Sequence, residues 1–141
     1  MTINEIQDEI IEEFESFDDW TDRYALLIDY GNHLEPFPQE KKTDENLIPG
    51  CQSKLWFFIE MQNGRIIYHG ESDAILVKGL VALLIKVLSN HTAQEIVDAD
   101  IYFLDAIDLK NHLSPSRSNG LLSMLKQMKR FATEQYEKEK G

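Results

Sequence analysis

The chain has a single cysteine, Cys51, and one thiol limits the chemistry that the sequence can support. A lone cysteine excludes an internal disulfide. It also excludes a zinc or iron–sulfur site that one chain would build from several thiolates. The thiol can act as a nucleophile, as an acceptor of a transferred group or as a redox sensor. Alternatively, it packs as a small apolar side chain.

Cys51 stands in the segment Pro49-Gly50-Cys51-Gln52-Ser53, between a proline-rich stretch and a hydrophobic one. Gly50 permits backbone conformations that are closed to other residues. Gln52 and Ser53 either shape the loop around the thiol or only bond to its backbone amides. Sulfur exchange, in which a thiolate attacks the outer sulfur of a persulfide, needs access and some thiolate but no catalytic relay. The segment therefore predicts a loop that can present a thiol to a sulfur donor.

Hydrolytic cysteine catalysis is a more demanding alternative, because it needs a base that a third group holds in place. The chain has four histidines, and none of them stands in a recognisable catalytic motif. His69, on an expected strand, is the one that the sequence places loosely near Cys51. A hydrolase that uses Cys51 and His69 stays open as an alternative, as does an iron–sulfur cluster shared by two chains.

The element expected to position Cys51 is a β-hairpin that follows it. Residues 54–62 alternate like a strand, and Asn63-Gly64 is typical of a type I′ turn that leads into a second strand over residues 65–70. Trp56 is predicted to lie in the core. Residues 33–50 contain three prolines, so we expect irregular structure there, and long loops of this kind are often functional.

Helices are expected on both sides of the hairpin. Capping boxes begin with Thr2 and Thr92, and Ser114-Pro115 is typical of a helix start. Either Ser72 or Asp73 is expected to cap the central helix, in which Gly79 indicates close packing. The predicted helices cover residues 3–15, 19–32, 74–88, 92–99, a short stretch within 101–109, and 115–136. We therefore expect residues 1–141 to form one α+β domain, with helices packed on a small antiparallel sheet.

The composition of the chain limits the kinds of partner that it can bind and the places where we expect it. The net charge of −11 disfavours nucleic-acid binding and favours a partner with a basic docking face, unless it serves only solubility. No apolar run of about 18 residues is present, so we expect no membrane span. The acidic N-terminal stretch does not resemble a signal peptide, and we expect a cytoplasmic protein.

Several segments together resemble the SufE family, which includes the related CsdE proteins. Trp20 with Tyr24 matches the aromatic pair of an early helix in that family. The resemblance keeps the family's order and spacing along nearly the whole chain. The matching segments are Ile-Pro-Gly-Cys-Gln-Ser-Lys-Leu-Trp at 48–56, Gly-Glu-Ser-Asp-Ala at 70–74, Val-Lys-Gly-Leu at 77–80, and Leu-Ser-Pro-Ser-Arg-Ser-Asn-Gly-Leu at 113–121.

The resemblance implies a fold similar to that of the NifU and IscU iron–sulfur scaffold proteins. It implies a pyridoxal-phosphate-dependent cysteine desulfurase, of the SufS or CsdA type, as the partner. The chain would accept persulfide sulfur on Cys51, stimulate the desulfurase and pass the sulfur to an iron–sulfur scaffold of the SufBCD type. It would be an accessory protein and not itself an enzyme. We expect no cofactor in it, because the pyridoxal phosphate belongs to the partner.

Two more residues are candidates for shaping the site or binding the partner. Asp73 either contacts the site or only caps a helix. Arg117 either bonds to the cysteine loop or the partner, or is simply an exposed arginine. The alternative to this whole interpretation is an acidic protein-interaction module in which Cys51 is structural and no sulfur chemistry takes place.

Overall fold

The computed structural model describes residues 1–49 and 53–141 of the chain. Its sheet is an antiparallel hairpin of β1 (Leu55–Gln62) and β2 (Arg65–Ser72). The pairing runs from Gln62 opposite Arg65 to Leu55 opposite Ser72. Asn63 and Gly64 have φ of 53° and 78°, as a type I′ turn requires. The predicted hairpin is confirmed, and its second strand runs two residues further than expected.

Helices make up most of the remaining structure, so the predicted α+β class is confirmed. Both capping boxes are formed, and Ser114 Oγ accepts a hydrogen bond from the Arg117 backbone N–H. The last helix extends four residues beyond its predicted end. The helices are α1 (Ile3–Glu15), α2 (Trp20–Asn32), α3 (Ile75–Leu88), α4 (Ala93–Asp98), α5 (Phe103–Ala106) and α6 (Pro115–Lys140), with short 3₁₀ turns η1 (Gln39–Lys41), η2 (Asp44–Asn46) and η3 (Lys110–His112).

The start of α3 differs from the prediction. Ala74 takes the N-cap position, with no side-chain cap bond, and neither Ser72 nor Asp73 caps the helix. Both of these side chains bond instead to Lys54, which precedes β1. These two side chains therefore bond to Lys54, which is distant in the sequence, and do not cap the helix as the sequence indicated.

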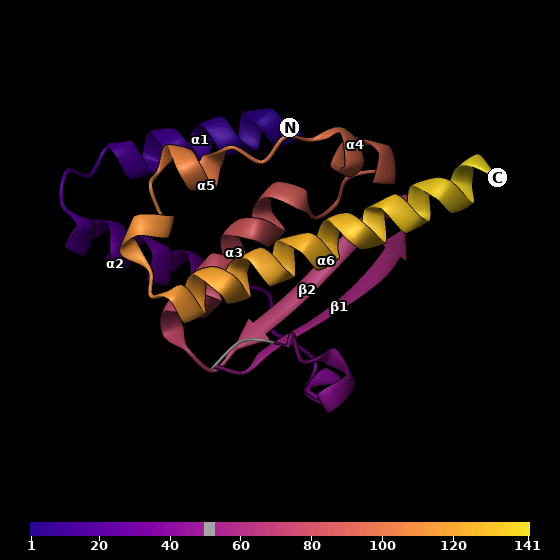
Figure 1. Ribbon diagram of the computed structural model, residues 1–141, viewed down its shortest axis with the longest axis horizontal. Coiled ribbons are helices and arrows are strands. Elements are labelled where there is room, and N and C mark those ends of the chain that lie inside the picture. The colour runs from indigo at the N-terminus through magenta and orange to yellow at the C-terminus, as the bar shows by residue number, and fades with distance from the viewer. Residues whose placement is uncertain (50–52) are drawn as a thin grey trace.

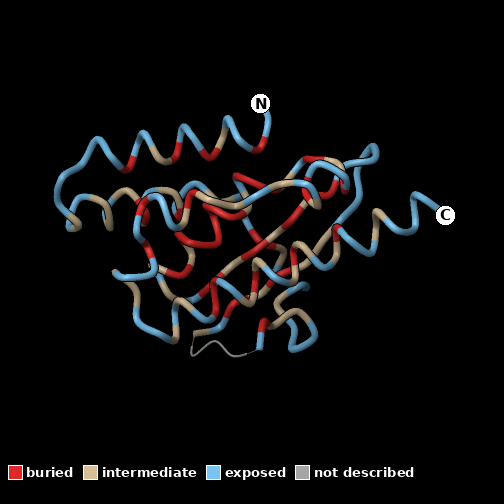
Figure 2. Tube along the Cα trace, turned by 45° about the horizontal axis from the view of Figure 1, so that its top comes forward, coloured by how far each residue is buried: buried red, intermediate tan, exposed pale blue. Residues whose placement is uncertain are grey.

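The helices lie on one side of the hairpin, and the segment with η1 and η2 lies on the other side (Figure 1). The central element is α3, which contacts α1, α2, α6 and β2 and has nine buried residues out of fourteen. In the tube coloured by burial, the buried stretches converge on this helix and on the hairpin (Figure 2). These elements contribute to one hydrophobic cluster.

Two close contacts fix the packing of α3. A Cβ on Gly31 of α2 would lie 2.9 Å from the Gly79 backbone nitrogen, and a Cβ on Gly79 would clash with the Leu27 carbonyl oxygen. The prediction that Gly79 marks close packing is confirmed. On the same face of the hairpin, Tyr68 in β2 donates a hydrogen bond to the Met128 carbonyl in α6 over 2.7 Å, and burial raises the pKa of its phenol. The helices α3 and α6 therefore both pack on this face of the hairpin.

None of the helices in residues 1–49 and 53–141 is both long enough and apolar enough to cross a membrane.

Candidate functional site

The predicted site residues Gly50, Cys51 and Gln52 lie outside the described residues, but the structure defines both flanks of this segment. The Ile48 backbone N–H donates a hydrogen bond to the Leu55 carbonyl over 2.9 Å, and Leu47 forms an antiparallel bridge with Trp56. Ile48 and Leu55 are 5% and 1% exposed. Ile48 before Cys51 and Leu55 after it are therefore both buried and bonded to each other, which holds the two flanks of the Cys51 segment together.

A second set of contacts fixes Lys54, three residues after Cys51. Its backbone N–H donates to Asp73 Oδ1 over 3.0 Å, and its carbonyl accepts from Ser72 Oγ over 2.8 Å and from the Asp73 N–H over 3.3 Å. Ser72 Oγ also accepts from the Ala74 N–H over 3.2 Å. The start of α3 is therefore tied to the flank of the Cys51 segment. This brings Asp73 to the site, while its role there stays a prediction.

Ser53 and Arg117 are the other predicted site residues that the structure describes. Ser53 is partly buried, and Arg117 is exposed in the first turn of α6. Going along β2 from Tyr68 to Gly70, the α6 neighbours change from Met128 to Met124, so the two elements run in opposite directions. At about 3.3 Å per strand residue and about 1.5 Å per helix residue, this places the first turn of α6 at the Asp73 end of β2. Figure 1 shows the same arrangement.

Trp56 and Phe58 in β1 face away from the helices, whereas Phe57 between them is buried in the core. Trp56 is half-buried, so the prediction that it belongs to the core is wrong. Its ring lies under the ammonium groups of Lys42 and Lys54, at 5.4 and 6.0 Å from the ring centroid. The helices cover the opposite face of the hairpin, and among residues 1–49 and 53–141 it is the segment with η1 and η2 that lies on the side of this ring. The sequence did not indicate Lys42, Lys54 or Ser72 as part of the site.

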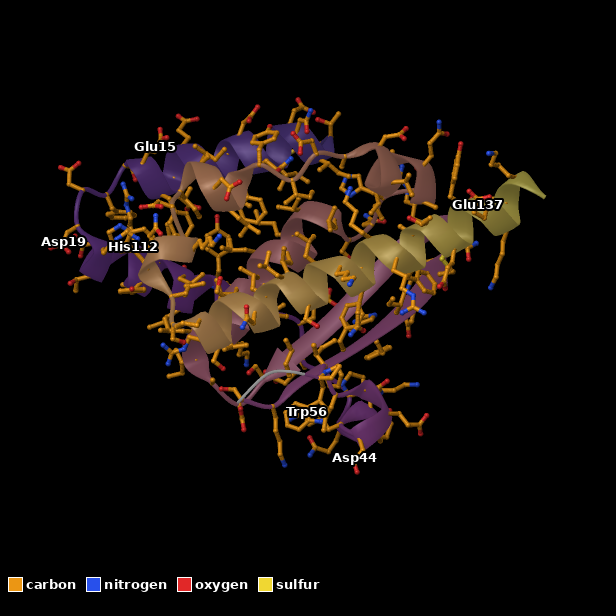
Figure 3. All side chains as sticks on the ribbon, viewed as in Figure 1. Glu15, Asp19, Asp44, Trp56, His112 and Glu137 are labelled. Carbon is orange, nitrogen blue, oxygen red and sulfur yellow. The ribbon has the colours of Figure 1, made fainter. Side chains whose placement is uncertain are left out.

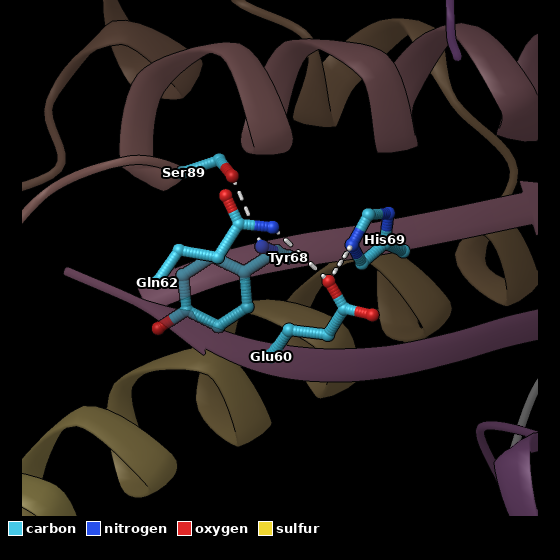
Figure 4. A network of polar contacts seen from close by, with 5 residues as sticks. All are labelled: Glu60, Gln62, Tyr68, His69 and Ser89. Atoms are coloured by element: carbon cyan, nitrogen blue, oxygen red, sulfur yellow. Dashed lines mark hydrogen bonds and ion pairs between the residues drawn. The ribbon is translucent and has the colours of Figure 1, made fainter. Parts of the chain in front are cut away.

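His69 is engaged away from the flanks of the Cys51 segment. Its ring stacks on Phe58 with centroids 4.4 Å apart, and its Nε2 lies 3.3 Å from Glu60 Oε2. Figure 4 shows the contact between His69 and Glu60. It stands three strand residues before Ser72, about 10 Å along β2. The described contacts of His69 are therefore those of a strand histidine in a polar and aromatic cluster.

Neither a metal cluster nor a deep cavity marks the described flanks. In residues 1–49 and 53–141, no three or more His, Cys, Asp or Glu side chains are grouped to hold a metal ion. A groove of about 810 Å³ lies between α2, α3 and β2, and includes Tyr30, Phe37 and His69. Residues 47–49 and 53–56 do not line it. What the structure describes here is a fixed pair of flanks on either side of the segment that contains Cys51.

Comparison with known proteins agrees with this architecture. The family model for SufE, an Fe-S metabolism associated domain, matches residues 8–132. An uncharacterized SufE-like protein of Synechocystis is 42% identical over 119 residues, which cover 84% of this chain and 75% of the relative. The solution structure of a hypothetical protein from Thermus thermophilus superposes with a TM-score of 0.75 at 18% identity, covering 93% of this chain and 96% of that one. The chain therefore belongs to the SufE family, whose domain is associated with iron–sulfur metabolism.

Proposed function

We propose that this protein accepts a sulfane sulfur from a pyridoxal-phosphate-dependent cysteine desulfurase on Cys51, stimulates the desulfurase, and passes the sulfur to iron–sulfur cluster assembly. One observation carries the proposal. The only cysteine of a SufE-family chain stands on a segment whose two flanks are closed by the bond from Ile48 to Leu55. Fixed flanks on both sides of the Cys51 segment suit a thiol that another protein must reach.

The proposed transfer is a thiol–persulfide exchange. The Cys51 thiolate attacks the outer sulfur of the donor's persulfide and forms a new sulfur–sulfur bond. The donor's own sulfur–sulfur bond breaks, and its cysteine leaves as a thiolate. One sulfur atom moves from donor to acceptor without net oxidation or reduction. No base is required in this chain, which is consistent with the engagement of His69 by Glu60 and Phe58.

Other residues take supporting roles in the proposal. Gly50, Gln52 and Ser53 shape the loop that carries the thiol. Asp73 holds the flank of the loop through the Lys54 N–H. We propose that Arg117, exposed at the same end of the molecule, contacts the loop or the desulfurase. The chain would act in the cytoplasm as a single domain, with a SufBCD-type scaffold as the downstream recipient.

The decisive experiment is a mass measurement. The protein is incubated with a cysteine desulfurase and cysteine, and its intact mass is then determined. We expect the added mass of one sulfur, and we expect the Cys51→Ser variant to lose both this adduct and the stimulation of the desulfurase. Because the chain has one cysteine, the adduct can be assigned without ambiguity.

His69→Ala serves as the matched control. It removes the only histidine that the sequence placed near Cys51, and we expect sulfur loading to be unchanged. Stimulation by Cys51→Ser at the wild-type level would overturn the proposal, because the thiol would then not be the working group. A folded His69→Ala variant that takes up no sulfur would instead favour a cysteine–histidine pair.

A further inference from the structure

The outer side of the hairpin carries three lysines over two aromatic rings. Lys41 Nζ lies 5.2 Å from the Phe58 ring centroid, and Lys42 Nζ and Lys54 Nζ lie 5.4 and 6.0 Å from that of Trp56. We call these five residues the lysine–aromatic face. Lys41 ends η1 and Lys42 follows it, Lys54 immediately precedes β1, and the two rings belong to β1. Figure 3 shows Trp56 between the hairpin and the η1 and η2 segment.

The two glutamates that the hairpin strands place on this side each have a basic partner. Glu60 Oε2 lies 3.3 Å from His69 Nε2, and Glu71 Oε1 lies 3.3 Å from Lys78 Nζ. None of the ion pairs in the described part of the chain involves the three lysines of the lysine–aromatic face. Rings attract cations weakly at exposed sites, by about 0.5–1 kcal/mol, so these ammonium groups remain open to a stronger anionic partner.

Acidic side chains surround the three lysines of the lysine–aromatic face. Glu40, Asp44 and Glu45 are exposed in the same segment and balance the three lysines in number. Asp44 lies at the outer end of the segment, beyond Trp56 (Figure 3). These carboxylates lie within a few residues of Lys41 and Lys42, so the lysine–aromatic face acts on a docked surface through ammonium groups at contact distance and not through a net positive charge.

The lysine–aromatic face adjoins the Cys51 segment on both sides of the sequence. After the Cys51 segment comes Lys54, whose backbone N–H is bonded to Asp73. Before it comes the segment that carries Lys41 and Lys42, which the bridge between Leu47 and Trp56 joins to β1. A protein that exchanges sulfur with Cys51 must approach this end of the hairpin. We infer, on the basis of the proposed function, that the lysine–aromatic face docks a carboxylate-rich patch on the sulfur-donating desulfurase.

The net charge of the chain makes such docking directional. At −11 overall, most of the surface repels an acidic patch, and the lysine–aromatic face offers ammonium groups with which carboxylates of such a patch can pair. Complementary charge of this kind acts mainly on the association rate and on orientation. The sequence alone favoured a basic partner surface. The lysine–aromatic face adds a place for an acidic patch of the partner. A partner that carries both a basic and an acidic patch would then bind in one orientation.

The test compares two variants with the same total charge. Lys41→Glu/Lys42→Glu reverses the lysine–aromatic face, and Lys126→Glu/Lys138→Glu reverses two exposed lysines on α6. Binding to a cysteine desulfurase is measured by titration at about 50 mM and about 300 mM salt, with thermal unfolding as the check on folding. We expect the first variant to bind about tenfold more weakly at low salt, with the difference shrinking at high salt, and the control to bind within about twofold of wild type.

Three results separate this inference from the proposed function. Wild-type binding by the face variant, or an equal loss in the control, overturns the inference while sulfur loading of the wild type stands. Weaker desulfurase binding by the face variant, together with loading by a small-molecule persulfide donor at the wild-type rate, supports it, because the thiol is then competent and only docking is impaired. A wild-type protein that takes no sulfur from either donor removes the proposed function instead. If the glutamate variant unfolds, Lys41→Met/Lys42→Met is measured in its place, with an expected weakening of about threefold.

Discussion

The contact between α2 and α3 and the outer side of the hairpin show two different ways of holding structure together. At the first, glycines bring two backbones so close that a single added carbon at Gly31 or Gly79 has no room. At the second, half-buried rings lie under lysine side chains, and the chain is held by a few hydrogen bonds to Lys54. Shape complementarity fixes the helical side, while polar contacts hold the side that carries Cys51.

The difference indicates where this protein can change shape. Close-packed interiors resist displacement because each atom has neighbours on all sides. Hydrogen bonds at a partly exposed flank can exchange with water at a net cost of about 1 kcal/mol each. A loop that must meet a partner is therefore better placed on the polar side of the molecule, with the packed side as its support.

The largest expected effect tests the packed side. Gly79→Ala would force its new carbon against the Leu27 carbonyl, and we expect the free energy of unfolding to fall by about 2 kcal/mol, even though alanine favours helices. Chemical denaturation measures this change. Gly64→Asn is the matched control, because Gly64 has a left-handed backbone and open space around it, and its loss should stay below about 0.5 kcal/mol. Similar losses in both variants would mean that close packing does not distinguish the contact between α2 and α3.

A smaller effect tests the polar closure at the Cys51 segment. Asp73→Ala removes the acceptor of the Lys54 N–H, and we expect about 1 kcal/mol less stability together with faster hydrogen exchange at the Lys54 amide. Asp44→Ala removes an exposed carboxylate from η2 and should leave that amide unchanged. If Lys54 exchanges at the same rate in all three proteins, Asp73 does not hold the flank.

The smallest expected effect concerns polar contacts on the helical side, at the capping box that begins α4. The Thr92 backbone N–H donates to Glu95 and lowers the pKa of this carboxyl below its ordinary value of 4.5. A depressed pKa in the folded state adds stability that is present above pH 4.5 and is lost as the pH falls through the folded value. Because the side chain is solvent-exposed, we expect less than about 0.5 kcal/mol.

Urea denaturation between about pH 6 and about pH 3 measures the contribution of Glu95. The wild type should lose slightly more stability across this range than Glu95→Gln, in which the side chain does not titrate. Glu139→Gln, near the C-terminal end of α6, should follow the wild-type curve. A Glu95→Gln curve parallel to that of the wild type would show that the capping box carries no pH dependence.

Local patterns predicted those parts of the fold that depend on local chemistry. The Asn63-Gly64 turn, the capping boxes at Thr2 and Thr92 and the start of α6 at Ser114 follow from backbone and hydrogen-bonding preferences within a few residues. The close approach at Gly79 was indicated by a glycine inside an apolar helix.

The errors arose where a residue has a distant partner. Ser72 and Asp73 match the pattern of a helix cap, but Lys54, 18 and 19 residues away, takes their side chains. Trp56 is apolar enough for the core, but it lies on the side of the hairpin opposite the helices, under two lysines. At the candidate site, the sequence predicted roles for Cys51, which lies outside the described residues, and for Asp73, whose role stays a prediction. Sequence patterns could not show that Asp73 bonds to the Lys54 flank.

The long α6 helix offers a practical handle on the molecule. Its 26 residues span roughly 39 Å, and its last buried residue is Ala132. The turns that follow therefore project past the core, at the opposite end from the base of the Cys51 segment (Figure 1). A dye or surface tether attached there would leave the thiol-bearing end free, so that desulfurase encounters could be followed on immobilised molecules.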